Sequence, residues 1–148
     1  MMNILGIARI VLVVRDIEKA ADLFENKYKM EIKRLSPDVA ATIGAKMFLC
    51  PQCNLEVSSP ILPLSENASD DLKNTVKILE NQESIIVALG LKVENAAQAA
   101  KEAEEKGIRI IDNFETKDFS SLGIEHLVQY NLNQEDTLGI TMAFVQQD

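Results

Sequence analysis

The chain has 148 residues, of which 47% are hydrophobic, and a formal net charge of −8 at pH 7. A chain of this length and composition can bury a core of its own, so one compact domain is expected. The acidic balance and the absence of any run of Lys or Arg argue against binding to nucleic acid, whose phosphate backbone requires many cationic contacts.

The N-terminal segment MMNILGIARIVLVVRD has no basic stretch ahead of its apolar run, and Arg9, Arg15 and Asp16 interrupt or close that run. Neither a signal peptide nor a membrane span is expected from this pattern. Two cysteines do not form a disulfide framework in a chain of this length, which is typical of a reducing compartment. We therefore predict a cytoplasmic protein that does not bind membranes.

The first half of the chain predicts the order strand, helix, strand, strand, strand. Residues 4–14 are almost continuously aliphatic, as in a strand covered on both faces. Asp16 can cap a following helix, in which apolar residues recur at helical spacing up to Phe24. Further strands are predicted at 30–35, 41–50 and 54–59, with turn sequences at 36–38 and 51–52.

The second half predicts the same order again. A connector, residues 60–83, contains the helical pattern SDDLKNTVKILEN. Asn95 then caps a helix that follows one strand and ends on Gly107. The strands of this half are predicted at 84–93, 108–112, 124–132 and 139–147.

The two halves align when Arg15-Asp16 is superposed on Glu94-Asn95, strand on strand and cap on cap. This predicts a single α+β domain built from two βαβββ modules, 1–59 and 84–148, joined by the connector 60–83. Chance is the rival explanation, because many α/β segments consist of a strand, an acidic cap and a helix. We favour duplication.

The segment ARIVLVVRDIEKAADLF resembles the opening of the vicinal oxygen chelate superfamily, which includes glyoxalases, bleomycin resistance proteins and extradiol dioxygenases. LGLKVENAAQAAKEAEEKGIRII is similar to the start of their second module, and DTLGITMAFV to their last strand. The resemblance implies that the modules form a cupped, partly open mixed β-sheet barrel that binds a small molecule. It also implies a homodimer.

Metal-dependent members hold a divalent ion on four inward side chains, one from the first and one from the last strand of each module. Carried over by position, these ligands fall on Arg9, Glu56, Ala88 and Ala143. Only Glu56 keeps a ligand type, and an arginine repels a cation, so no metal cofactor is expected. We expect instead an Arg9–Glu56 ion pair. A one-residue register slip, which would turn Arg9 to solvent, is the alternative.

The strand 124–132 has two mixed faces. His126, the only histidine, and Tyr130 share one face, while Gln129 and Asn131 share the other. If the first face points inward, His126 and Tyr130 add polar tips to a small-molecule pocket, and His126 can transfer protons. The plainer alternative is a histidine at the surface.

The sequence Cys50-Pro51-Gln52-Cys53 is compatible with a redox or zinc motif. A strand, rather than a helix, follows it, and the chain has one histidine and no further cysteine. We favour a hairpin turn with two partly buried thiols.

Two functions from different classes remain open. The first is a glyoxalase- or bleomycin-resistance-like protein that binds a small anionic organic molecule without a metal, through Arg9, Glu56, His126 and Tyr130. The second is a metal-dependent lyase, epimerase or dioxygenase of the same superfamily, with Glu56 as base or divalent-metal ligand and His126 as its catalytic partner. A protein that only binds other proteins would show an exposed apolar patch instead.

Overall fold

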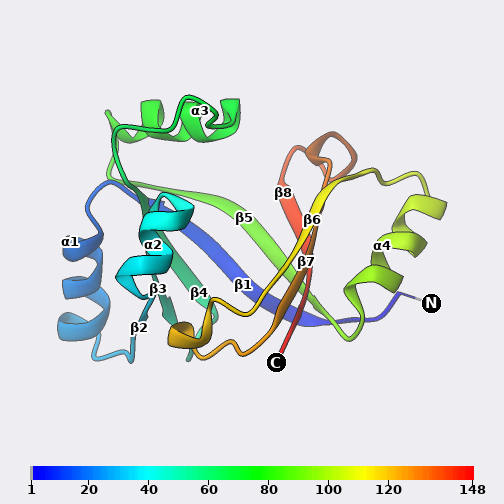
Figure 1. The fold of residues 1–148 in the computed structure, drawn as a ribbon, viewed down its shortest axis with the longest axis horizontal. Helices are drawn as coiled ribbons and strands as arrows, with labels where there is room; N and C mark the ends of the chain where they lie inside the picture. The colour runs from blue at the N-terminus through cyan, green and yellow to red at the C-terminus, as the bar shows by residue number, and fades with distance from the viewer. Residues whose placement is uncertain (1) are drawn as a thin grey trace. The chain divides into compact units, whose positions relative to one another are not determined.

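The computed structural model describes residues 2–148, and their secondary structure follows the predicted order with one added helix (Figure 1). The elements of the first half are β1 (Ile4–Val14), α1 (Ile17–Ala21), the π-helix η1 (Asp22–Lys27), β2 (Lys33–Arg34), α2 (Pro37–Ile43), β3 (Ala45–Cys50) and β4 (Leu55–Pro60).

The connector contains the predicted helix, α3 (Asp70–Leu79). The elements of the second half are β5 (Ser84–Val93), α4 (Ala96–Glu105), β6 (Ile110–Thr116), the 3₁₀ turn η2 (Ser120–Leu122), β7 (Leu127–Leu132), the 3₁₀ turn η3 (Gln134–Asp136) and β8 (Thr141–Gln147). Among residues 2–148, no helix has the length and hydrophobicity that crossing a membrane requires.

Both predicted helix caps are present. The Asp16 carboxylate accepts hydrogen bonds from the backbone N–H groups of Glu18 and Lys19, both at 3.1 Å. The Asn95 side chain accepts one from the N–H of Gln98 at 3.0 Å. These bonds satisfy amide groups that have no acceptor within the helix, so the two module helices begin at equivalent positions for the same reason.

The predicted strand at 41–50 is wrong in its first part, because residues 37–43 form α2. Pro37 occupies the first turn of this helix, where its fixed φ suits the helical backbone and its missing N–H is not needed. Gly44 ends the helix with φ +77°, and its N–H donates to the carbonyl of Ala40 at 2.9 Å. The predicted strand at 30–35 is reduced to Lys33–Arg34.

The strands form one mixed sheet in the order β2-β3-β4-β1-β5-β8-β7-β6. Each module therefore has its first strand beside its last, β1 beside β4 and β5 beside β8. The β5–β8 pair is parallel, whereas the β3–β4, β6–β7 and β7–β8 pairs are antiparallel. The same strand order in both halves confirms the α+β class with two βαβββ modules.

Two compact units divide the chain. The N-terminal unit comprises Val11–Ile86, and the C-terminal unit comprises the residues up to Ile10 together with Val87–Asp148. Strands β1 and β5 contribute residues to both units. The single-domain organisation stays a prediction.

Each unit has its own apolar core on the helix side of its strands. The core under α1 consists of Val14, Ile17, Ala21, Phe48, Cys50 and Val57. The core under α4 consists of Val93, Ala96, Ala99, Ala100, Ala103, Leu132 and Phe144. Because four of these residues are alanines, α4 packs closely on β7 and β8 (Figure 1).

Candidate functional site

Within the C-terminal unit, one face of the strands is covered by α4, and the other carries the candidate site. Phe144 of β8 packs into the α4 core, so its neighbours Ala143 and Val145 point to the opposite face, since successive strand side chains alternate. Strand register places Gly90 beside Ala143 and extends this face across β5, β8 and β7. We call it the α4-distal face, and its residues include Arg9, Gly90, Gln129, Asn131, Ala143, Val145 and Gln147.

Arg9 of β1 is the charged group of this face. Its exposed fraction is only 5%, and its Nη2 donates a hydrogen bond to Oε1 of Gln147 at 2.7 Å. A Cβ atom placed on Gly90 would lie 3.3 Å from Cγ of Arg9 and 3.0 Å from Cγ2 of Val145. The stem of Arg9 therefore passes over Gly90 on the same face as Val145. The alternative in which Arg9 faces solvent is excluded by its burial.

The residues beside Arg9 are small. Gly90 and Ala143 are register partners on β5 and β8, and Ala143 is in turn opposite Asn131 on β7. In the strand order β5 and β8 lie between β1 and β7, so two strands separate Arg9 from Asn131. The stem of Arg9 and the side chain of Val145 pack over Gly90, so the strands are close-packed at this position.

Two hydrogen-bonded amide side chains, those of Gln129 and Asn131, lie on the same face, and the site prediction did not include them. Nε2 of Gln129 donates to Oδ1 of Asn131 at 2.8 Å, and Nδ2 of Asn131 donates to Oδ1 of Asp112 at 2.5 Å. The alternation of residues in 124–132 did place Gln129 and Asn131 on one face. The prediction favoured the other face, so these amides were missed.

The predicted site residues His126 and Tyr130 are not brought together with Arg9. Tyr130 and Val128 pack against the α4 core. The ring of His126 is 28% exposed, and its Nε2 lies 2.5 Å from Oε1 of Glu115, a residue whose register partner is Val128. These contacts occupy the α4 side of the strands. A role for His126 and Tyr130 in ligand binding stays a prediction.

Glu56 lies on β4 in the N-terminal unit and is 8% exposed. Its neighbours Leu55 and Val57 pack with the α1 core, so alternation turns Glu56 to the opposite face of β4. Glu56 and Ala143 therefore occupy the same kind of position, on the last strand of a module and away from the module helix. The Arg9–Glu56 ion pair stays a prediction.

The residues at the four superfamily ligand positions do not fit a divalent cation. Arg9 is a cation, Ala88 and Ala143 have no donor atom, and Glu56 is a single carboxylate. Divalent ions in proteins require several oxygen, nitrogen or sulfur donors that converge. Among residues 2–148, no group of three or more His, Cys, Asp or Glu side chains has the arrangement of a metal site.

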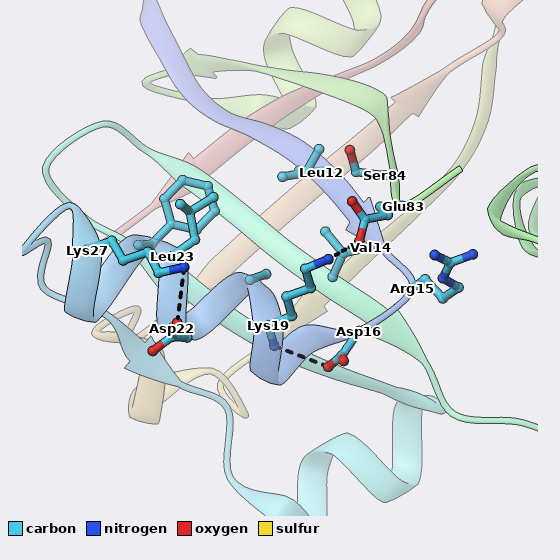
Figure 2. Close-up of a pocket in the computed structure, with 12 residues that line it drawn as sticks. Leu12, Val14, Arg15, Asp16, Lys19, Asp22, Leu23, Lys27, Glu83 and Ser84 are labelled. Atoms are coloured by element: carbon cyan, nitrogen blue, oxygen red, sulfur yellow. Dashed lines mark hydrogen bonds and ion pairs between the residues drawn. The ribbon is translucent and has the colours of Figure 1, made fainter. Parts of the chain in front are cut away.

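A cavity of about 250 Å³ lies in the N-terminal unit, between the end of β1, the helical segment α1–η1 and the residue pair Glu83-Ser84. Figure 2 shows Lys19 directed toward Glu83 and Lys27 directed toward Asp22. Nζ of Lys27 lies 3.7 Å from Oδ2 of Asp22. The hydrogen bond from Lys19 holds the pKa of the Glu83 carboxyl below its usual range. Both lysines at the rim are thus matched by acids, which gives the cavity no charge preference for a ligand.

No family model matches the sequence, and no curated protein matches it. Solved structures do match in fold. Methylmalonyl-CoA epimerase from Mycobacterium tuberculosis has a TM-score of 0.68 at 14% identity, covering 98% of this chain and 89% of that one. A second methylmalonyl-CoA epimerase structure has a TM-score of 0.72 at 11% identity, with coverages of 98% and 97%.

A third match is a methylmalonyl-CoA epimerase in complex with methylmalonyl-CoA and NH4+, with a TM-score of 0.66 at 12% identity and coverages of 97% and 95%. These matches span nearly the whole chain. The protein therefore has a glyoxalase-like fold, as the sequence resemblance predicted. At 11–14% identity, the matches define the fold and leave the activity to be argued from the site.

Proposed function

We propose that the protein binds a small anionic organic molecule on the α4-distal face, with Arg9 as the anchor. The observation that carries this proposal is a guanidinium at 5% exposure beside the small residues Gly90 and Ala143. The planar fork of arginine suits a carboxylate or phosphate, which it can bind through two parallel hydrogen bonds.

The neighbouring residues suggest the chemistry of the rest of the ligand. Gln129 and Asn131 carry amide groups that can both donate and accept hydrogen bonds, which suits a carbonyl or hydroxyl substituent. Short dicarboxylates and their thioesters combine these features, and the fold shared with methylmalonyl-CoA epimerases makes such thioesters the first compounds to test.

We expect Arg9→Gln to weaken anion binding by roughly 10- to 150-fold, the equivalent of losing a charge-assisted hydrogen bond of ~1.5–3 kcal/mol. Arg9→Lys keeps the charge but not the fork, so its affinity is expected to fall between those of wild type and Arg9→Gln. Thermal-shift screening with malonate, methylmalonate, succinate and their CoA thioesters finds the ligand, because a bound ligand stabilises the native state. Calorimetry then measures the affinities of the folded variants.

The matched control is Arg109→Gln. Arg109 belongs to the same unit but lies at the surface, where it binds Asp136 and Glu135. Its substitution is expected to leave affinity unchanged. Equal affinities for wild type and Arg9→Gln would contradict the proposal, as would a screen in which no anion stabilises the wild type.

A second candidate function is an epimerase that moves the proton next to a thioester carbonyl. Its support is the buried carboxylate of Glu56, which lies away from the α1 core and could act as a general base. No metal-dependent step is needed for this candidate, because a carboxylate alone can abstract the proton.

For this candidate, Glu56→Gln is expected to slow α-proton exchange by about 10²–10⁴-fold, the range for removal of a positioned general base. The exchange of methylmalonyl-CoA in D₂O is followed by proton NMR on the wild type, on Glu56→Gln and on Glu31→Gln, an exposed glutamate of the same unit. No exchange by the wild type, or equal exchange by wild type and Glu56→Gln, would leave binding as the supported function. The homodimer and the cytoplasmic location stay predictions from the sequence.

A further inference from the structure

The turn between β3 and β4, in the N-terminal unit, holds the chain's two cysteines. The backbone N–H of Cys53 donates to the carbonyl oxygen of Cys50 at 3.3 Å, which closes a four-residue turn through Pro51 and Gln52. The Sγ of Cys53 lies 3.9 Å from the same oxygen. A turn of this kind brings its end Cα atoms within about 7 Å of each other, close to the range of roughly 4.4–6.8 Å that disulfides span.

The two thiols have different environments. Cys53 is exposed, whereas Cys50 has no exposed surface and belongs to the α1 core with Phe48 and Val57. The pKa of the Cys50 thiol is raised to about 11, mainly by burial and to a smaller extent by the neighbouring Cys53. Cys53 is therefore the thiol that an external reagent can reach, and Cys50 is a second thiol shielded behind it.

We propose that Cys50 and Cys53 form a reversible disulfide by thiol–disulfide exchange with a small disulfide such as glutathione disulfide. The Cys53 thiolate attacks one sulfur of the oxidant, forming a mixed disulfide and releasing one glutathione thiolate. Cys50 then loses its proton to solvent and attacks Sγ of Cys53, which releases the second glutathione thiolate. Two protein thiols are oxidised, and one oxidant disulfide is reduced to two thiols.

The geometry gives the second step a direction. In the mixed disulfide Cys53 carries no charge, so one of the two influences that disfavour the Cys50 thiolate is removed. Cys50 must also move its sulfur out of the α1 core to reach Cys53, which loosens the packing against Phe48 and Val57. The turn leads directly into β4, the strand that carries Glu56. Oxidation is therefore expected to alter the support of that strand, and the redox-sensitive turn is an addition to the predicted hairpin turn, which the antiparallel pairing of β3 and β4 confirms.

The test incubates native protein with defined ratios of reduced to oxidised glutathione, blocks free thiols by alkylation and measures intact and peptide masses. The wild type is expected to lose two hydrogens through a disulfide between Cys50 and Cys53 of the same chain. It is expected to recover both thiols in excess dithiothreitol. Cys50→Ser is expected to stop at a mixed disulfide of Cys53 with glutathione. Cys53→Ser is expected to stay unmodified, because the remaining thiol is buried.

Serine at the buried position 50 can impair folding, so Cys50→Ala serves as a second trapping variant, and circular dichroism verifies that each variant is folded. Three results would overturn the proposal. They are a wild type that ends as a mixed disulfide, a wild type that links two chains, and a folded Cys53→Ser that reacts as fast as the position-50 variants.

Discussion

Replacing Phe144 with alanine is expected to lower the free energy of unfolding by about 3–5 kcal/mol, the cost of deleting a buried aromatic side chain. Phe144 is 2% exposed and fills the space between β8 and α4. The helix faces it with alanines, among them Ala99 and Ala103, whose side chains have no rotamers with which to fill the resulting cavity. Urea denaturation followed by far-ultraviolet circular dichroism measures the loss.

The matched control is Phe114→Ala, the same chemical change on β6 of the same unit. Phe114 is 40% exposed and lies outside the α4 core, so its removal is expected to cost less than about 1 kcal/mol. Similar losses for the two variants would contradict the assignment of Phe144 to the core that orients β8. That orientation matters for the proposed site, because it is what turns Ala143 to the α4-distal face.

The features that the sequence predicted correctly are those set by local chemistry. Asp16 and Asn95 cap equivalent helices because each side chain reaches amide groups only two or three residues away. The module pattern was visible for the same reason, since strand and helix periodicities recur in the same order. The segment 37–43 was misassigned because Ser-Pro-Asp suits both a turn and the first turn of a helix.

The site itself depends on contacts between distant residues, which local patterns do not fix. Arg9 and Gln147 are separated by 138 residues, and nothing near Arg9 in the sequence indicates its hydrogen-bond partner. Alternation showed that Gln129 and Asn131 share a face of their strand. It could not show which face α4 covers, because both faces mix polar and apolar residues. In the structure Tyr130 packs against the alanine-rich surface of α4, which identifies the face of the strand that α4 covers.

Replacing Gly90 with alanine tests whether the close packing at Gly90 positions Arg9 in the proposed site. We expect a loss of about 1–3 kcal/mol of stability, because overpacking a close-packed position forces its neighbours to move. The new Cβ would lie 3.0 Å from Cγ2 of Val145 and 3.3 Å from Cγ of Arg9. The displaced Arg9 is also expected to bind an anionic ligand more weakly. Urea denaturation measures the first effect, and calorimetry with the ligand found by screening measures the second.

A double variant separates the two contacts. Val145→Ala removes the atom nearest to the new Cβ, so Gly90→Ala combined with Val145→Ala is expected to be less destabilised than the sum of the single changes, by about 0.5–3 kcal/mol. The contact with Arg9 remains in the double variant, so ligand affinity is expected to stay reduced while stability partly recovers. Strict additivity would show that Gly90 and Val145 do not touch. Recovery of ligand affinity together with stability would show that Gly90 supports the fold but does not position Arg9.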